Sequence, residues 1–261
     1  MIHLDSFLPQ PIKVAVFDFD GTLSTLRCGW ERVMEPMMLE FIAGEHPDEA
    51  TVREVREYIS ASTGIQTILQ MKHLCEMVAS HGGKPLSPWE YKAEYNRRLM
   101  ENVSLRRREA SEGKREAYLM VGAEDFLRAL KARGVRMFAA SGTDDADVKE
   151  EARTLGLFGY FDEIAGAMPM SEGCSKEATL RRLIEEGGSE GLLVVGDGPV
   201  EIRLGRQVGA VTLGGVGNEE TRRGVDPIKV DRLTAAGAHL LIDCFADPER
   251  ILYAIEKGEE Q

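Results

Sequence analysis

Apolar residues follow two patterns along this chain, and each pattern predicts its own kind of secondary structure. Short apolar runs bounded by turn residues predict strands at residues 12–17, 135–141, 163–167, 191–197 and 238–244. Helical spacing separates most of these runs and also closes the chain, at residues 123–132, 144–155, 175–188, 199–208 and 248–256. Strands that alternate with helices of this length predict an α/β fold with a parallel sheet covered on both faces.

Residues 24–115 differ from this alternation, because they carry helical spacing and almost no strand signal. In this stretch apolar residues such as Ile65 and Ile68 recur three and four positions apart, as they do on one face of a helix. We therefore expect one α/β domain built from residues 1–23 and 116–261, interrupted after its first strand by an all-helical insertion.

Composition limits the kinds of partner. Of 261 residues, 43% are hydrophobic, which suffices for a core, and the net charge is −12. An acidic chain is a poor general binder of nucleic acid or anionic membranes, although a few local groups can still hold a small phosphorylated molecule. We expect no membrane span and no signal peptide. The four cysteines have no metal-ligand spacing, which is typical of reduced thiols in a cytoplasmic protein.

Acidic residues follow two of the expected strands. Asp18 and Asp20 come at the end of the first strand, and Asp197 ends the strand at residues 191–197, with Glu201 four positions later. Because the carboxyl ends of parallel strands meet at one edge of a sheet, these carboxylates should converge there. Carboxylates that converge repel one another unless a cation lies among them, and oxygen ligands suit Mg²⁺. The sequence therefore predicts a magnesium site with Asp18, Asp20, Asp197 and Glu201 as ligands.

A hydroxyl and an ammonium group are expected at the same edge. Ser141 ends the second strand and can donate to a phosphoryl oxygen, and Lys176 begins its own helix and can balance charge on nucleophile and phosphate. Asp18 can attack phosphorus, and Asp20 can protonate the leaving oxygen and later deprotonate a water. Gly21 allows the backbone to turn beside the phosphate.

These segments match a known family. Four segments resemble, in order and spacing, the four motifs of the haloacid dehalogenase superfamily of phosphatases. They are DFDGT (18–22), SGT (141–143), the lysine of SKEATL (175–180) and GDGPVE (196–201). The resemblance implies a Rossmann-like three-layer core, a magnesium-dependent aspartyl-phosphate mechanism, and a cap domain, here residues 24–115, that closes over the substrate. It adds Thr22 and Gly142 to the substrate-binding residues. Glu201 stands where the family usually has aspartate, which leaves open whether it binds the metal directly or through water.

The expected function is a phosphomonoesterase that acts on a small phosphorylated metabolite. A phosphomutase of the β-phosphoglucomutase type would use the same residues, and a non-catalytic ligand-binding regulator would keep the same fold. Simpler roles are also open for single residues: Ser141 could cap a helix, Glu201 could favour a helix N-terminus, and Lys176 could be solvated. Arg27 and Trp30 are candidates for substrate contacts. The sequence does not give the oligomeric state.

Overall fold

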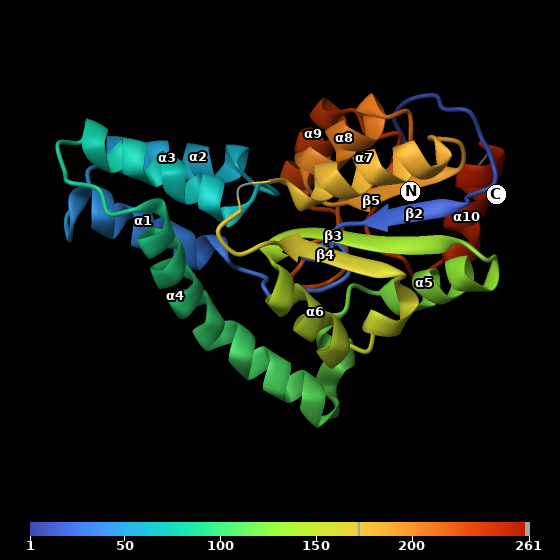
Figure 1. Cartoon of the computed structure of the whole chain (residues 1–261), viewed down its shortest axis with the longest axis horizontal. Coiled ribbons are helices and arrows are strands. Elements are labelled where there is room, and N and C mark those ends of the chain that lie inside the picture. Colours follow the sequence, from blue (N-terminus) through green and yellow to red (C-terminus); the bar gives the residue numbers. More distant parts are fainter. Residues whose placement is uncertain (172, 259–261) are drawn as a thin grey trace.

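The computed structural model describes residues 1–171 and 173–258 of the chain. One seven-stranded sheet has the order β1-β7-β6-β5-β2-β3-β4, in which every pair is parallel except β1 with β7 (Figure 1). The strands are β1 (Ile2–His3), β2 (Val14–Phe17), β3 (Arg136–Asp144), β4 (Glu163–Ala167), β5 (Leu192–Gly196), β6 (Val211–Gly215) and β7 (Leu240–Ile242). The predicted α/β fold with a parallel sheet is confirmed.

Helices cover both faces of this sheet (Figure 1). One layer contains α5 (Ala123–Ala132), α6 (Asp145–Thr154) and α10 (Pro248–Lys257), and the other contains α7 (Ser175–Gly187), α8 (Pro199–Gln207) and α9 (Pro227–Ala236). The central strand β2 alternates between them: Ala15 and Phe17 pack with α5 and α10, whereas Val16 packs with α7. A strand that is buried on both faces has no polar side, which explains the continuous apolar run in the sequence.

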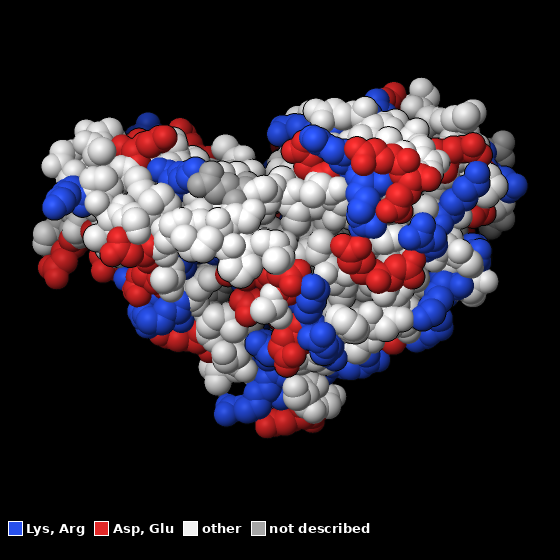
Figure 2. Space-filling model, in the orientation of Figure 1, with Lys and Arg blue, Asp and Glu red and all other residues white. Residues whose placement is uncertain are grey.

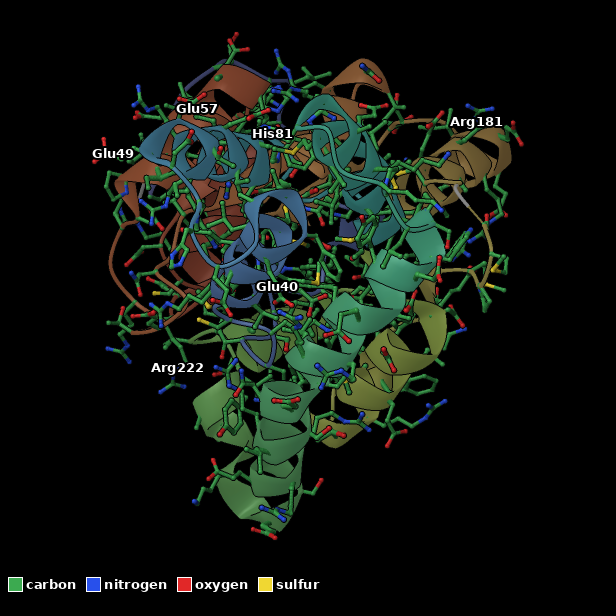
Figure 3. The ribbon with its side chains drawn as sticks, turned by 90° about the vertical axis from the view of Figure 1, so that its left-hand side faces the viewer. Glu40, Glu49, Glu57, His81, Arg181 and Arg222 are labelled. Atoms are coloured by element: carbon green, nitrogen blue, oxygen red, sulfur yellow. The ribbon has the colours of Figure 1, made fainter. Side chains whose placement is uncertain are left out.

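The segment between β2 and β3 is mainly helical, with α1 (Glu31–Ala43), α2 (Glu49–Ala61), α3 (Thr67–Ser80) and α4 (Pro88–Glu109). These helices bury their own hydrophobic cluster, which includes Met34, Met38 and Tyr91 and is separate from the clusters of the sheet. Figure 3 looks onto this segment, with Glu40, Glu49, Glu57 and His81 on its outer side. A short π-helix (Ala110–Lys114) and a 3₁₀ helix (Arg115–Tyr118) lead back to the sheet.

Specific contacts attach the long helix α4 to the sheet. Asp144, at the end of β3, accepts hydrogen bonds from Lys92 and Asn96. Arg106 donates to the backbone oxygens of Leu26 and Cys28, so it supports the chain that leaves β2 rather than facing a ligand. These contacts fix the helical segment beside the carboxyl ends of β2 and β3.

Three elements were not expected from the sequence, namely the antiparallel edge strand β1, the strand β6 and the helix α9. The 3₁₀ helix at Phe158–Tyr160 was also not expected. Basic and acidic side chains are intermixed on the face shown in Figure 2, without one sign dominating it. No helix in the described part of the chain combines the length and the apolar character that crossing a bilayer requires.

Candidate active site

Three carboxylates meet where β2 and β5 end. Asp18 directly follows β2, Asp197 follows β5, and Glu201 lies in the first turn of α8. One oxygen of each lies within 4.8 Å of the others, and all three residues are buried. The convergence of Asp18, Asp197 and Glu201 is as the sequence predicted, and such a set of oxygens suits a hard divalent cation such as Mg²⁺.

Lys176 lies among these carboxylates and is itself buried. Its Nζ is 3.0 Å from Asp18 Oδ2 and 2.8 Å from Glu201 Oε2. Burial alone would lower the pKa of Lys176, but Asp18 and Glu201 raise it above its ordinary value. The lysine therefore stays charged, and it neutralises part of the cluster permanently.

The negative charge that Lys176 does not neutralise affects the pKa of Asp18. Burial, together with the nearby carboxylates of Glu201, Asp197 and Asp20, raises the pKa of Asp18 well above its ordinary value, although Lys176 acts in the opposite direction. A divalent cation at this point would favour the ionised carboxylate that a nucleophile needs. The donor set and its excess negative charge therefore both fit a magnesium ion.

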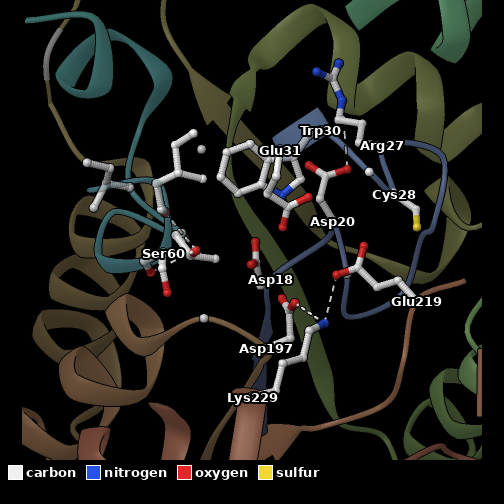
Figure 4. Close-up of a pocket in the computed structure, with 18 of the residues that line it drawn as sticks. Asp18, Asp20, Arg27, Cys28, Trp30, Glu31, Ser60, Asp197, Glu219 and Lys229 are labelled. Carbon is white, nitrogen blue, oxygen red and sulfur yellow. Dashed lines mark hydrogen bonds and ion pairs between the residues drawn. The ribbon is translucent and has the colours of Figure 1, made fainter. Parts of the chain in front are cut away.

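Asp20 faces another part of the site. Its Oδ2 accepts hydrogen bonds from Ser141 Oγ at 3.2 Å and from Thr143 Oγ1 at 2.8 Å. Its Oδ1 is buried without a hydrogen-bond partner in the described chain and lies 3.9 Å from Arg27 Nε (Figure 4). The carboxylate of Asp20 thus lies outside the group of converging oxygens, because the hydroxyl groups at the end of β3 hold it, and its role as a magnesium ligand stays a prediction.

Gly21 and Thr22 pack against Asp197. The backbone of Gly21 has φ of +73°, and a Cβ atom there would lie 2.3 Å from Asp197 Oδ2. Both observations require glycine, because other residues disfavour this conformation and would clash. Thr22 Oγ1 donates to Asp197 Oδ1 at 3.1 Å. In this structure Thr22 therefore orients a carboxylate.

Gly142 lies between Ser141 and the helical segment. A Cβ atom at this position would lie 3.3 Å from the backbone oxygen of Ile65. The Nζ of Lys176 is also 3.5 Å from the backbone oxygen of Gly64. The turn before α3 therefore closes directly over the groups that the sequence singled out.

Two residues at the site were missed by sequence reasoning, the buried Lys229 and the partly buried Glu219. Lys229, in the first turn of α9, donates to Asp197 Oδ2 at 2.6 Å and to Glu219 Oε1 at 2.8 Å (Figure 4). Burial would raise the pKa of Asp197, but the ion pair with Lys229 outweighs it and lowers that pKa. The Asp226–Pro227 pair, a helix-start signal, could have located α9, but no local pattern links Lys229 to a residue 32 positions earlier.

A cavity of about 480 Å³ lies above the carboxylates, between the sheet and the helical segment. It is lined by Asp18, Asp20, Ser141 and Lys176 on one side and by α1, α2 and α4 residues on the other. Arg27 and Trp30, the candidates for substrate contacts, both line it. A cavity of this size accommodates a small molecule.

Comparison with known proteins agrees with this geometry. Residues 12–209 match the family model described as haloacid dehalogenase-like hydrolase, so the chain belongs to this family of hydrolases. The match spans β2 to the end of α8, so it includes Asp18, Lys176, Asp197 and Glu201 but not Lys229 or Glu219. A search of curated proteins found no match.

Several solved structures share the fold. A predicted phosphoglycolate phosphatase from Haemophilus somnus 129PT has a TM-score of 0.62 at 17% identity, covering 92% of this chain and 97% of the other. A β-phosphoglucomutase from Clostridium difficile has a TM-score of 0.59 at 16% identity, covering 90% of this chain and 92% of the other. A protein described as a HAD hydrolase from Bacillus subtilis, solved with magnesium bound, has a TM-score of 0.57 at 15% identity, covering 95% of this chain and 99% of the other. At these identities the likeness shows the fold alone.

Proposed function

We propose that this hydrolase is a magnesium-dependent phosphomonoesterase that acts on a small phosphorylated metabolite through an aspartyl-phosphate at Asp18. The proposal depends on one observation: Asp18 is buried beside Asp197, Glu201 and Lys176 at the floor of a cavity of about 480 Å³. The names of structural neighbours, a phosphoglycolate phosphatase and a β-phosphoglucomutase, are compatible with phosphoryl chemistry.

In the proposed first step, a carboxylate oxygen of Asp18 attacks phosphorus and the ester P–O bond breaks. The departing alkoxide takes a proton from Asp20, so that an alcohol leaves and Asp18 carries the phosphoryl group. Ser141 and Lys176 would donate to the phosphoryl oxygens. Asp18, Asp197 and Glu201 would hold Mg²⁺. Its positive charge would stabilise the negative charge of the phosphoryl group during transfer.

In the second step, Asp20 accepts a proton from a water molecule, which attacks the phosphorylated Asp18. The acyl–phosphate bond breaks, inorganic phosphate forms, and Asp18 returns to a carboxylate. Asp20 is suited to both steps because Ser141 and Thr143 hold it beside the cluster rather than within it. We further propose that residues 24–115 act as a cap that excludes bulk water, since their turn before α3 contacts Lys176.

The protein is proposed to work in the cytoplasm, because its four cysteines lie apart as free thiols. The test of function is release of inorganic phosphate from p-nitrophenyl phosphate and from a panel of phosphorylated metabolites, with Mg²⁺ and with EDTA. We expect turnover that needs the metal and is lost in Asp18→Asn. Asp162→Asn, which changes a half-exposed ion pair with Arg136, is the matched control and should stay active.

Acid quenching during turnover, followed by mass spectrometry, should find the phosphoryl group on the peptide that contains Asp18. A folded protein that binds Mg²⁺ but releases no phosphate from any panel member contradicts the proposal and favours a regulatory role. Interconversion of sugar phosphate isomers without net phosphate release would instead identify a phosphomutase.

A further inference from the structure

The chamber above Asp18 has more acidic than basic side chains. In the described chain, eight Asp or Glu residues and six Lys or Arg residues line it. A phosphomonoester brings about two more negative charges at neutral pH, which a divalent cation does no more than offset. After both have bound, the chamber therefore still favours positive charge on the rest of the substrate.

Most basic side chains of the chamber already have acidic partners. Arg27 pairs with Glu151 at 2.6 Å, and Arg56 pairs with Glu35 at 2.8 Å. Lys176 and Lys229 are held within the site itself, and Arg32 pairs with Glu220. Arg232 differs from these, because it donates to the backbone oxygen of Asp197 and its Nε has no hydrogen-bond partner in the described chain. At the other five basic side chains, a negatively charged leaving group would have to displace a carboxylate before it could bind.

Glu31 differs from the other acids of the chamber. It is the first residue of α1 and is exposed, and its carboxylate has no hydrogen bond or ion pair to another residue in the described chain. Figure 4 shows it beside Trp30, near Asp18 and Asp20. Desolvation by the residues packed around it raises the pKa of Glu31, although Lys229 acts in the opposite direction, and a cationic ligand would relieve that cost by pairing with the ionised form.

Aromatic rings lie on the same side of the chamber. Trp30 precedes Glu31 and lines the chamber, and Tyr95 of α4 also lines it. Tyr95 is close enough to Glu31 for the carboxylate to contribute to the raised pKa of its phenol, after the larger effect of burial. A carboxylate beside aromatic rings is the chemistry that recognises organic ammonium groups, through charge pairing and cation–π attraction.

Building on the phosphatase function proposed above, we propose that the substrate is a phosphomonoester whose alcohol carries an ammonium group, which Glu31 and Trp30 bind. The phosphate end would lie at Asp18, Ser141 and Lys176, and the ammonium end would lie at the start of α1. Glu31 also sits in the first turn of a helix, where an acid is favourable for stability alone. The experiment must therefore separate substrate selection from a structural effect.

The test compares substrates that differ in charge but hardly in shape. Phosphocholine is paired with its neutral isostere 3,3-dimethylbutyl phosphate, and phosphoethanolamine with 2-hydroxyethyl phosphate. We expect kcat/KM to be about tenfold or more higher for the charged member of at least one pair, because only that member can pair its charge with a carboxylate. Comparing the two pairs distinguishes a quaternary from a primary ammonium ligand.

Glu31→Gln should lower kcat/KM for the preferred ammonium substrate about tenfold. The loss should appear in KM rather than kcat, because the ammonium group does not react. The neutral isostere should change less than about twofold. Glu40→Gln is the matched control, because it removes from the same helix an exposed carboxylate that pairs with Arg98 and does not line the chamber. That control should leave the preference for the charged substrate unchanged.

Three results overturn the inference while leaving the phosphatase proposal intact. These are equal turnover of charged and neutral pairs, a preference for an acidic substrate such as phosphoglycolate, and an equal effect of Glu31→Gln on all substrates. A melting-temperature change in Glu31→Gln without a change in selectivity would assign Glu31 to helix stability. If the folded, magnesium-loaded protein also fails to hydrolyse p-nitrophenyl phosphate, the phosphatase proposal fails, and the substrate inference fails with it.

Discussion

Replacing Lys229 by methionine tests whether this lysine holds the acidic site together. Its Nζ lies 2.6 Å from Asp197 Oδ2 and 2.8 Å from Glu219 Oε1, and its side chain is 6% exposed. Methionine keeps much of the packing but leaves both carboxylates without their cation. Removing one partner of a buried pair costs about 3–5 kcal/mol, so the free energy of unfolding in EDTA should fall by that amount.

The effect should depend on pH in a defined direction. Lys229 lowers the pKa of Asp197 in the folded protein, so the pair adds stability above the unfolded pKa of about 4, and this is lost as pH falls through the folded value. Asp197 and Glu219 also raise the pKa of Lys229. The stability that comes from the charged lysine is therefore present below its unfolded pKa of about 10.4 and is lost as pH rises through its folded pKa. The difference between wild type and variant should therefore be largest near neutral pH and shrink towards both extremes.

Urea unfolding followed by circular dichroism at several pH values measures this difference. Lys13→Met is the control, because it breaks a surface pair with Glu190 whose side chains are 58% and 78% exposed and should cost less than about 1 kcal/mol. A Lys229→Met variant that loses no more than this control, or loses the same amount at every pH, would show that the pair does not stabilise the site.

Two further changes test the geometry around the chamber. Gly21→Ala should abolish turnover while the protein stays folded, because its Cβ would lie 2.3 Å from Asp197 Oδ2; activity within tenfold of wild type would refute the close approach. Asp144→Ala should remove the hydrogen bonds from Lys92 and Asn96 that attach α4 to β3, costing about 1–3 kcal/mol. Amide hydrogen exchange should then rise in residues 88–98, and unchanged protection there would mean that other contacts hold the helix.

Elements with a strong local pattern were predictable from the sequence. The helix at Ala123–Ala132 was placed correctly at both ends, because its apolar residues recur with helical spacing and Gly134 stops the chain just beyond it. The strand β4 at Glu163–Ala167 also matched. The convergence of Asp18 with Asp197 could be expected because both follow strands, and parallel strands end at a common edge.

Features that depend on distant parts of the chain were not predictable. The strand β1 has only two residues and forms by pairing with β7, more than two hundred positions away. The hydrogen bonds from Ser141 and Thr143 to Asp20 join residues more than a hundred positions apart, so the position of this carboxylate beside the cluster could not be read from the sequence. Lys229 follows an unremarkable helix start, and only the tertiary structure shows that it is the counterion of Asp197.

The hydrogen bonds of the cluster suggest how a metal could bind without disturbing it. One carboxylate oxygen of Asp197 accepts a hydrogen bond from Thr22 and the other accepts one from Lys229. In the same way, one oxygen of Glu201 accepts from the Gly198 amide and the other from Lys176. A carboxylate has about four acceptor positions, so each of these oxygens keeps one free for a cation. The lysines and amides can therefore hold the carboxylates in place in the folded protein before any metal arrives. The magnesium ion that we propose would then need only to balance the residual charge at Asp18, rather than to assemble the site.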